Sequence, residues 1–339
     1  MKKIIISALL LCLVASPLMG CTGKKEPDDT TEASATAAET LAETPAENFK
    51  YVLSPDGESI GITEYTGTAE TVVIPSMIDN KPVKFITTST NDDGSTHGAF
   101  EGSRVKKVVL PDGFISLGYR AFKDCTELTD INFPSTLNRP ISGSCFLNCT
   151  KLEKIDLSQT AIPSLGNDVF RGCASLREIK FPPELTEIGD RCFYNCSALE
   201  ELQLPEKLQK IGEEAPAGCS ALKTVTIPPQ MNLNSFHLGT FYDNPALEKI
   251  IFSEGREELV GYAMFHTVSP VEIIIPKSVK KFSTQTFAVC GKETFVFNGD
   301  CPEIVDAEFT SKVTIRYNPS TKGWDNCVWK GQYTLEPIQ

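Results

Sequence analysis

Large apolar residues recur along most of the chain with a period of about 23 residues. An apolar residue stands five positions before most of the recurring phenylalanines, and glycine often follows it, as in Leu117-Gly118 and Ile188-Gly189. Repetition at a fixed period of this length predicts a solenoid of stacked coils. Glycine at this position suits a tight turn or close packing between neighbouring coils. The phenylalanine column is spaced by 22 to 25 residues, with Pro216 in one vacant slot, and consists of Phe100, Phe122, Phe146, Phe170, Phe193, Phe241, Phe265 and Phe287.

A short segment after each phenylalanine alternates apolar and polar residues and ends at proline, as in LTDINFP, SLREIKFP and ALKTVTIP. This pattern predicts one strand of four to six residues in every coil. The apolar side chains of a lone coil contribute on the order of 10 to 15 kcal/mol when buried, whereas ordering its backbone costs roughly 25 to 45 kcal/mol. The coils must therefore stack on one another and pair their strands in a parallel ladder.

The repeating frame L-x-x-I-x-F/L-P, followed by x-x-L-x-x-I-G-x-x-A/C/V-F-x-x-C, resembles the BspA-like leucine-rich repeats of bacterial surface proteins. The resemblance covers residues 49–339. It implies a leucine-rich-repeat solenoid that is mainly β, with short helical or irregular turns and a parallel strand ladder capped at both ends. Proteins similar to it are associated with adhesion and with varied protein contacts.

The ends of the repeat region differ from its middle. Residues 49–98 contain FKYVL and SIGITEY around a turn, which predicts a hairpin cap and a first coil. We expect the repeats to occupy residues 99–297 and a strand-rich carboxyl-terminal cap to occupy residues 298–339. Such caps are needed because the exposed ends of solenoids aggregate.

The first residues of the chain have the features of an export signal. Two lysines precede an apolar run from Ile4 to Val14, which is too short for a permanent transmembrane helix. The sequence Leu-Met-Gly-Cys ending at Cys21 resembles the bacterial lipoprotein signal. This resemblance implies a signal peptide over residues 1–20 and a diacylated Cys21 that anchors the protein to the membrane at the cell surface. An ordinary cleaved signal, with Cys21 incidental, is the alternative.

Residues 21–48 are acidic and contain one large apolar residue, Leu41, which predicts a disordered tether. The whole chain of 339 residues has a formal net charge of −12. An acidic protein is repelled by phosphate, so we expect no nucleic-acid partner.

Twelve cysteines are too few for a disulfide scaffold in a chain of this length. Six of them stand three residues after a slot of the phenylalanine column, where we expect small buried side chains with a weak hydrogen bond to a turn. Cys301 and Cys327 lie outside the repeat and are the pair best placed for a disulfide; the sequence leaves their redox state open. The six are Cys125, Cys149, Cys173, Cys196, Cys219 and Cys290.

No catalytic motif is present in the sequence. The three histidines, His97, His237 and His266, belong to different coils and have no zinc-binding spacing. Asn91, Asp92 and Asp93 share an acidic loop, but the position at which an EF-hand needs glutamate is Phe100. We therefore expect no enzyme activity, no cofactor and no metal.

The strand side chains that face away from the core are the best candidates for function. We expect this face to bind an extracellular or cell-surface protein, and the sequence leaves a host matrix protein and an envelope glycan open. A carbohydrate-binding or purely structural envelope component is the alternative, and in each case we expect a monomer. The candidate residues are Asp130, Asn132, Lys154, Asp156, Glu178, Lys180, Glu201, Gln203, Thr224 and Thr226.

Overall fold

The computed structural model describes residues 41–236, 239–261, 267, 270–287, 293–306, 308–309 and 312–339. Residues 41–339 form one compact unit. Within it the chain winds into a β-solenoid of about 11 turns, which confirms the leucine-rich-repeat solenoid expected from the sequence. The expected export signal, Cys21 and most of the expected tether lie outside the described residues.

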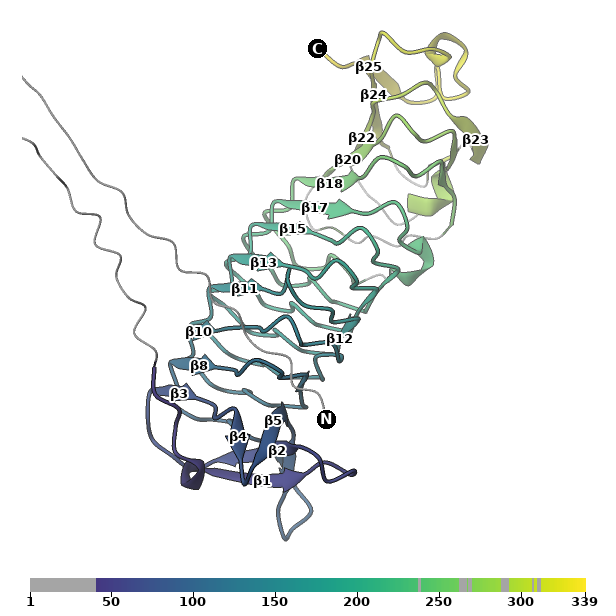
Figure 1. Ribbon diagram of the computed structural model, residues 1–339. Helices are drawn as coiled ribbons and strands as arrows, with labels where there is room; N and C mark the ends of the chain where they lie inside the picture. Colours follow the sequence, from purple (N-terminus) through teal and green to yellow (C-terminus); the bar gives the residue numbers. More distant parts are fainter. Residues whose placement is uncertain are drawn as a thin grey trace, which may run out of the picture. The chain divides into compact units, whose positions relative to one another are not determined.

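The main parallel ladder runs along one side of the solenoid, which we call the strand face (Figure 1). Its hydrogen bonds form three separate runs. The first joins β3, β8 and β10, the second joins β11 and β13, and the third joins β15, β17, β18, β20, β22, β24 and β25. Neighbouring strands keep a constant register, so Glu201, Thr224, Lys249 and Glu272 stand side by side. The strands are β3 (Thr71–Val73), β8 (Lys107–Val109), β10 (Asp130–Ile131), β11 (Lys154–Asp156), β13 (Glu178–Lys180), β15 (Glu201–Gln203), β17 (Thr224–Ile227), β18 (Lys249–Phe252), β20 (Glu272–Ile275), β22 (Thr294–Phe297), β24 (Thr314–Tyr317) and β25 (Thr334–Pro337).

A second set of short parallel strands lies at the apolar position before each turn. They pair between successive coils in three groups: β5 (Lys81–Ile86) pairs with β9, β14 pairs with β12 and β16, and β21 pairs with β19 and β23. These strands are β9 (Ser116–Leu117), β12 (Ser164–Leu165), β14 (Glu187–Ile188), β16 (Lys210–Ile211), β19 (Glu258–Leu259), β21 (Lys281–Ser283) and β23 (Glu303–Asp306). The described residues also contain the short 3-10 helices η1 (Ala46–Asn48), η2 (Leu233–Ser235), η3 (Thr284–Phe287) and η4 (Trp324–Asn326).

The amino-terminal end is closed by a small mixed sheet. β1 (Phe49–Leu53) pairs antiparallel with β2 (Ile60–Tyr65), and β2 pairs in parallel with β5 (Lys81–Ile86). β4 (Met77–Ile78) closes the other edge, and β6 (Thr88–Thr90) forms a hairpin with β7 (Thr96–Gly98). Order begins before residue 49, because the amide of Thr44 donates to Val73 O at 2.8 Å and Glu43 accepts from the amide of Ser76 at 2.8 Å. The part of the expected disordered tether that the structure describes is therefore attached to the first coil.

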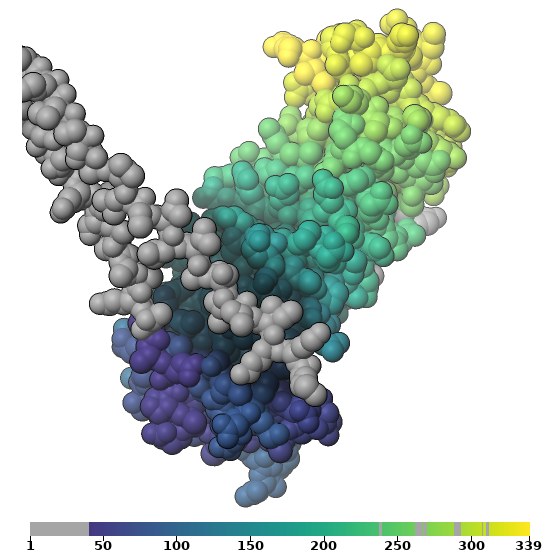
Figure 2. All heavy atoms as spheres, in the orientation of Figure 1, coloured from purple at the N-terminus to yellow at the C-terminus, as the bar shows by residue number. Residues whose placement is uncertain are grey.

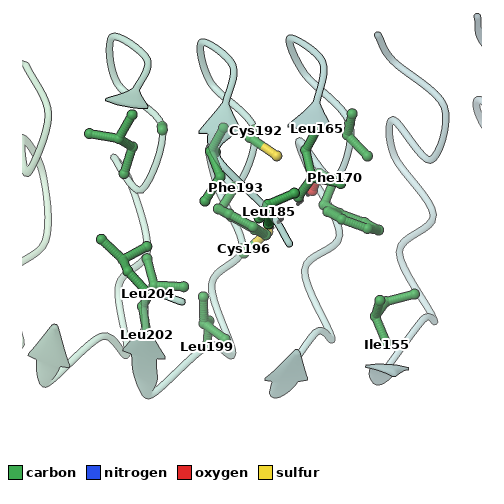
Figure 3. Packing of buried hydrophobic residues seen from close by; sticks show 14 of the residues in the cluster. Ile155, Leu165, Phe170, Leu185, Cys192, Phe193, Cys196, Leu199, Leu202 and Leu204 are labelled. Carbon is green, nitrogen blue, oxygen red and sulfur yellow. Dashed lines mark hydrogen bonds between the residues drawn. The ribbon is translucent and has the colours of Figure 1, made fainter. Parts of the chain in front are cut away.

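The recurring phenylalanines form an aromatic column inside the solenoid. The rings from Phe100 to Phe193 stack with centroids 5.0 to 5.8 Å apart and interplanar angles of 8 to 25°. Tyr65 of β2 extends the column into the cap, at 5.1 Å from Phe100. Phe241 and Phe287 are also buried, and Phe265 lies outside the described residues. Figure 3 shows Phe170 and Phe193 with neighbouring leucines in this core.

Glycine after the apolar position permits the coils to approach closely. A Cβ atom on Gly189 would lie 2.6 Å from the carbonyl carbon of Gly166, and one on Gly212 would lie 2.3 Å from the amide nitrogen of Asp190. Both glycines lie outside the left-handed region. Of the two reasons that the sequence offered for these glycines, close packing is therefore the correct one.

In the five coils whose column slots run from residue 122 to residue 216, two residues have a left-handed φ, one two positions before the slot and one two positions after it. Asp168 and Gly172 flank Phe170 with φ of 58° and 73°, and Arg191 and Asn195 flank Phe193 with φ of 51° and 61°. These two turns reverse the chain on either side of the buried ring. Aspartate, asparagine and glycine tolerate this conformation best, and their recurrence two positions after the ring is a signal that sequence reasoning missed.

Candidate binding face

The strand face presents two outward columns of side chains. The central residue of each strand is buried, as with Ile155, Leu202 and Val225, so the residues on either side of it point away from the core. Figure 3 shows Ile155 and Leu202 extending inward from their strands. The structure thus brings the candidate residues together on one surface, in register from coil to coil.

Opposite charges neutralise one another in the amino-terminal half of this face. Lys107 Nζ lies 2.6 Å from Asp130 Oδ2, and Lys154 Nζ lies 3.3 Å from Glu178 Oε2. Lys180 Nζ lies 3.2 Å from Asp156 Oδ2 and 3.6 Å from Glu178 Oε1. Hydrogen bonds from Ser158 and Lys180 hold the pKa of Asp156 below its ordinary value. These charges already have partners, so they offer a ligand little unpaired charge.

The side chain of Asn132 also has partners within the solenoid. Its Oδ1 accepts from the amide of Leu110 at 2.6 Å, and its Nδ2 donates to Leu110 O at 3.0 Å. The amide therefore bridges the backbones of two neighbouring coils. This gives Asn132 a structural role on the face, because the groups that a partner would contact are already bonded.

From β15 onward the strand face changes character. Thr224 and Thr226 on β17 are half-buried, and Ile251 and Ile274 continue the Thr226 column on β18 and β20. We call this area the Thr/Ile segment, made up of Thr224, Thr226, Lys249, Ile251, Glu272 and Ile274. A depression of about 330 Å³ lies beside it and is lined by Lys249, Glu272 and Thr294, among others.

Charge is sparse in the Thr/Ile segment. Arg316 of β24 reaches across β22 and places Nη1 3.1 Å from Glu272 Oε1. Among the described residues, neither Glu201 nor Lys249 forms an ion pair. The aliphatic side chains Ile251 and Ile274 at outward positions are the sequence signal for this segment, although the candidate residues expected from the sequence end at Thr226.

Outside the strand face, the cysteines form a ladder of thiols that donate to backbone carbonyls. The thiol of Cys149 donates to Phe122 O at 3.1 Å, that of Cys173 to Phe146 O at 3.2 Å and that of Cys196 to Phe170 O at 3.2 Å. Cys125 and Cys219 make the same bond to Phe100 and Phe193. All five side chains are buried, as the sequence predicted. Cys290 lies outside the described residues.

The described cysteines of the ladder are buried with raised pKa values, which disfavours the thiolate form. Burial raises the pKa of Cys125 to about 11 and the pKa values of Cys173 and Cys219 to about 12. Cys145 and Cys192 fill the position before the ring, and burial raises their pKa values as well. Thiolates are the reactive form of cysteine, so these residues act as core side chains.

Cys301 and Cys327 differ from the ladder. They lie side by side in the carboxyl-terminal cap as free thiols, with Cys301 partly exposed and Cys327 buried. The two thiols interact with each other. This interaction raises the pKa of Cys301 and lowers the pKa of Cys327 to about 7.

The other candidates for chemistry remain apart. His97 lies on β7, whereas His237 and His266 are outside the described residues. Asp93 accepts hydrogen bonds from Ser95, which lower its pKa, and it belongs to the turn between β6 and β7. Across the described ranges, no three His, Cys, Asp or Glu side chains gather as a metal site would require. None of the helices in the described part has the length and apolar character needed to cross a bilayer.

The repeat geometry agrees with a known family. The sequence profile described as "BspA type Leucine rich repeat region" matches residues 96–223 and 186–316, with six copies of the repeat. The chain belongs to this family. No curated protein matches it significantly.

Among solved structures, the BspA-type chain is similar to a leucine-rich repeat protein of T. pallidum, at 29% identity over 67% of this chain and 92% of that one, with a TM-score of 0.44. It is also similar to a leucine-rich repeat protein from Bacteroides ovatus, at 19% identity over 88% and 76% of the two chains, with a TM-score of 0.46. A third is a leucine-rich cell surface protein from Faecalibacterium prausnitzii, at 18% identity over 89% and 96%, with a TM-score of 0.43.

Proposed function

We propose that this BspA-type protein is a lipid-anchored cell-surface protein that binds a protein partner through its strand face. The observation that carries the proposal is the Thr/Ile segment. Thr226, Ile251 and Ile274 stand in one column on neighbouring strands, half-exposed, and the charges in the amino-terminal half of the same face are paired. Aliphatic and hydroxyl side chains on a flat ladder suit a protein surface that buries apolar area and adds hydrogen bonds at its rim.

The proposal places the contact away from the charged half of the strand face. Exposed ion pairs contribute little to binding or stability, and those around Lys154 and Lys180 are largely exposed. A partner that contacts these charges would first have to break the ion pairs. Contact with Thr226, Ile251 and Ile274 requires no such exchange, so we place the centre of the contact there.

A carbohydrate partner is less favoured by the positions of the aromatic residues. The outward positions of the strands from β8 to β20 hold no aromatic side chain. The exposed tyrosine Tyr119 lies at a turn near the aromatic column, and the guanidinium of Arg120 covers its ring at 5.0 Å. Tyr194 is covered in the same way by Arg171 at 5.3 Å. These rings have cationic partners and do not form an open stacking platform.

Binding is tested with purified protein and a panel of extracellular-matrix proteins and envelope glycans on biosensor surfaces. We expect a matrix or cell-surface protein to be captured and the Ile251→Glu variant to weaken that capture at least tenfold, because the charge would be desolvated in the contact. The matched control exchanges the charges of an existing pair, Lys154→Glu with Glu178→Lys, and should leave capture unchanged. Capture of glycans alone, or of no panel member, would contradict the proposal.

The anchor is tested separately. Replacement of Cys21 by Ala removes the sulfur that the lipid would occupy, so we expect the protein to move from the membrane fraction to the soluble fraction and to lose label from radioactive palmitate. Cys12→Ala, a second cysteine of the amino-terminal segment, is the control and should retain both. Palmitate label on the Cys21→Ala variant would disprove the assigned anchor.

A further inference from the structure

The carboxyl-terminal cap brings two segments of the chain together around Cys301 and Cys327. The amide of Cys301 donates to Lys322 O at 2.8 Å, and the indole of Trp324 donates to Gly299 O at 3.2 Å. A Cβ atom on Gly323 would lie 3.1 Å from Cys301 Cβ. The backbone around Cys301 is therefore fixed against the turn that leads into Cys327.

The surroundings of this pair differ from those of the cysteine ladder in two ways. Each ladder thiol donates to a backbone carbonyl of the preceding coil, as Cys196 does to Phe170 O, and so is held away from its neighbouring cysteine. The thiol of Cys301 instead meets Cys327, and its contact with Pro302 O is long, at 3.8 Å. Cys301 also lines an open depression of about 600 Å³ with Lys277, Lys280 and Asp300, so reagents reach it from solvent.

We propose that Cys301 and Cys327 are a redox-active dithiol that closes to an intramolecular disulfide when a low-molecular-weight disulfide reaches the cap. In this reaction both S–H bonds break and one S–S bond forms between the two residues. The S–S bond of the reagent breaks, and its two sulfur atoms take up the two electrons and the two protons to become two thiols. The product joins the start of β23 to the end of η4 and encloses β24, so it fastens the last coils of the solenoid.

The lowered pKa of Cys327 favours this exchange near neutral pH. The interaction with Cys301 lowers the pKa of Cys327 to about 7, whereas burial raises the pKa of the ladder thiol Cys173 to about 12. Because the thiolate is the attacking species, the rate of closure should rise as the pH passes through about 7. The ladder cysteines should not react at the same pH.

The test treats the reduced full chain with oxidised glutathione and follows intact mass and peptide maps. We expect the loss of two hydrogens and one cross-linked peptide pair containing residues 301 and 327. The melting temperature should rise by about 5 °C on oxidation, because the bridge constrains the unfolded chain. Cys301→Ser and Cys327→Ser should each abolish the cross-link, whereas Cys219→Ser, a ladder cysteine, should leave it unchanged.

A second measurement uses only the wild-type chain and does not depend on the folding of any variant. Brief alkylation with iodoacetamide at pH 7.5 should modify Cys301 or Cys327 before any described ladder cysteine. Prior oxidation should protect both residues. A stable glutathione adduct on Cys301 without ring closure, a disulfide between two chains, or equal alkylation of the ladder would each overturn the proposal.

Discussion

At the scale of single residues, the solenoid depends on positions where one atom more or fewer changes the contact between coils. Gly189 is such a position, because backbone atoms of the neighbouring coil occupy the space of a Cβ. Cys173 is another, because its thiol fills the core and satisfies Phe146 O. Gly189 has no side chain to offer a ligand and Cys173 is fully buried, so their recurrence in the sequence reflects packing.

Gly189→Ala should destabilise the protein by about 3 kcal/mol, because the added methyl group forces the neighbouring backbone apart. Urea unfolding followed by circular dichroism measures the change. Gly94→Asn is the control: Gly94 has open space around it and a left-handed φ of 81° that asparagine tolerates, so the loss should stay below about 1 kcal/mol. Equal losses in the two variants would contradict close packing as the role of Gly189.

A second prediction at this scale concerns the partly buried pair of Glu101 and Lys123, which meet at 2.7 Å. Burial opposes the charge on Glu101, but hydrogen bonds from Lys123 and the Gly98 amide outweigh it and lower its pKa. The pKa of Lys123 is raised in turn by its hydrogen bond to Glu101. The stabilisation is therefore present from above the unfolded pKa of Glu101 up to the unfolded pKa of Lys123. It disappears as the pH falls through the lowered value or rises through the raised one.

Glu101→Gln should thus cost about 1 kcal/mol near pH 7 and nothing once wild-type Glu101 is itself protonated. Thermal unfolding across pH 2 to 8 measures the difference. Glu184→Gln, which removes the exposed pair with Lys207, should have little effect at any pH. A constant difference between Glu101→Gln and wild type over the whole range would contradict this assignment.

At the scale of elements, the same bonds recur from coil to coil. The amide of Phe122 donates to Cys145 O and that of Phe146 to Val169 O, both at 2.8 Å, while the rings stack in one column. Each of these coils thus forms backbone hydrogen bonds to the coil before it and to the coil after it, and contributes one ring to the aromatic column. Pro216 occupies one slot of this column without an aromatic ring and is buried, as are its neighbours Ala215 and Ala217.

Phe146→Ala should cost about 4 kcal/mol, because it removes a fully buried ring with neighbours on both faces. Phe146→Leu should cost clearly less, since it keeps most of the apolar volume. Tyr119→Ala is the exposed aromatic control and should change stability by less than about 1 kcal/mol. Urea unfolding of the three variants gives the order directly, and an equal effect of Phe146→Ala and Tyr119→Ala would refute the column as a source of stability.

The period of the sequence was enough to predict the solenoid, the buried phenylalanines and the outward columns of the strand face. The choice among those outward residues was not predictable, because it depends on which neighbours meet across coils. Asn132 looks like a free polar group in the sequence, yet its side chain bonds to Leu110. A parallel register does predict that Lys154 lies beside Glu178, and the structure pairs the two. Contacts 22 to 24 residues apart decide this, and their geometry is fixed only when the register between strands is known.

At the scale of the whole described unit, stability depends on its two ends being covered. β22 pairs with β24, and the cap beyond it buries Trp324 and Trp329 against Phe297. Without these residues the ladder would end in an open strand edge flanked by apolar rings. Open edges of this kind pair with other chains.

Deletion of residues 298–339 should therefore produce oligomers larger than any that the full chain forms and lower the melting temperature. Size-exclusion chromatography with light scattering and a thermal scan measure both effects. Val328→Ser alters an exposed residue of the same cap and should leave both properties unchanged. A truncated chain that stays monomeric with an unchanged melting temperature would show that the cap has no such role.

The constant register between coils has a consequence for how such proteins diversify. Between Phe122 and Phe193 every coil presents the same hydrogen-bond donors and acceptors to the preceding and the following coil. A duplicated coil could therefore form the same bonds to both of its neighbours. The gain or loss of one repeat in the gene would lengthen or shorten the strand face, and the contacts between coils would stay the same. The length of the solenoid is therefore a trait that recombination within the gene adjusts in steps of one coil.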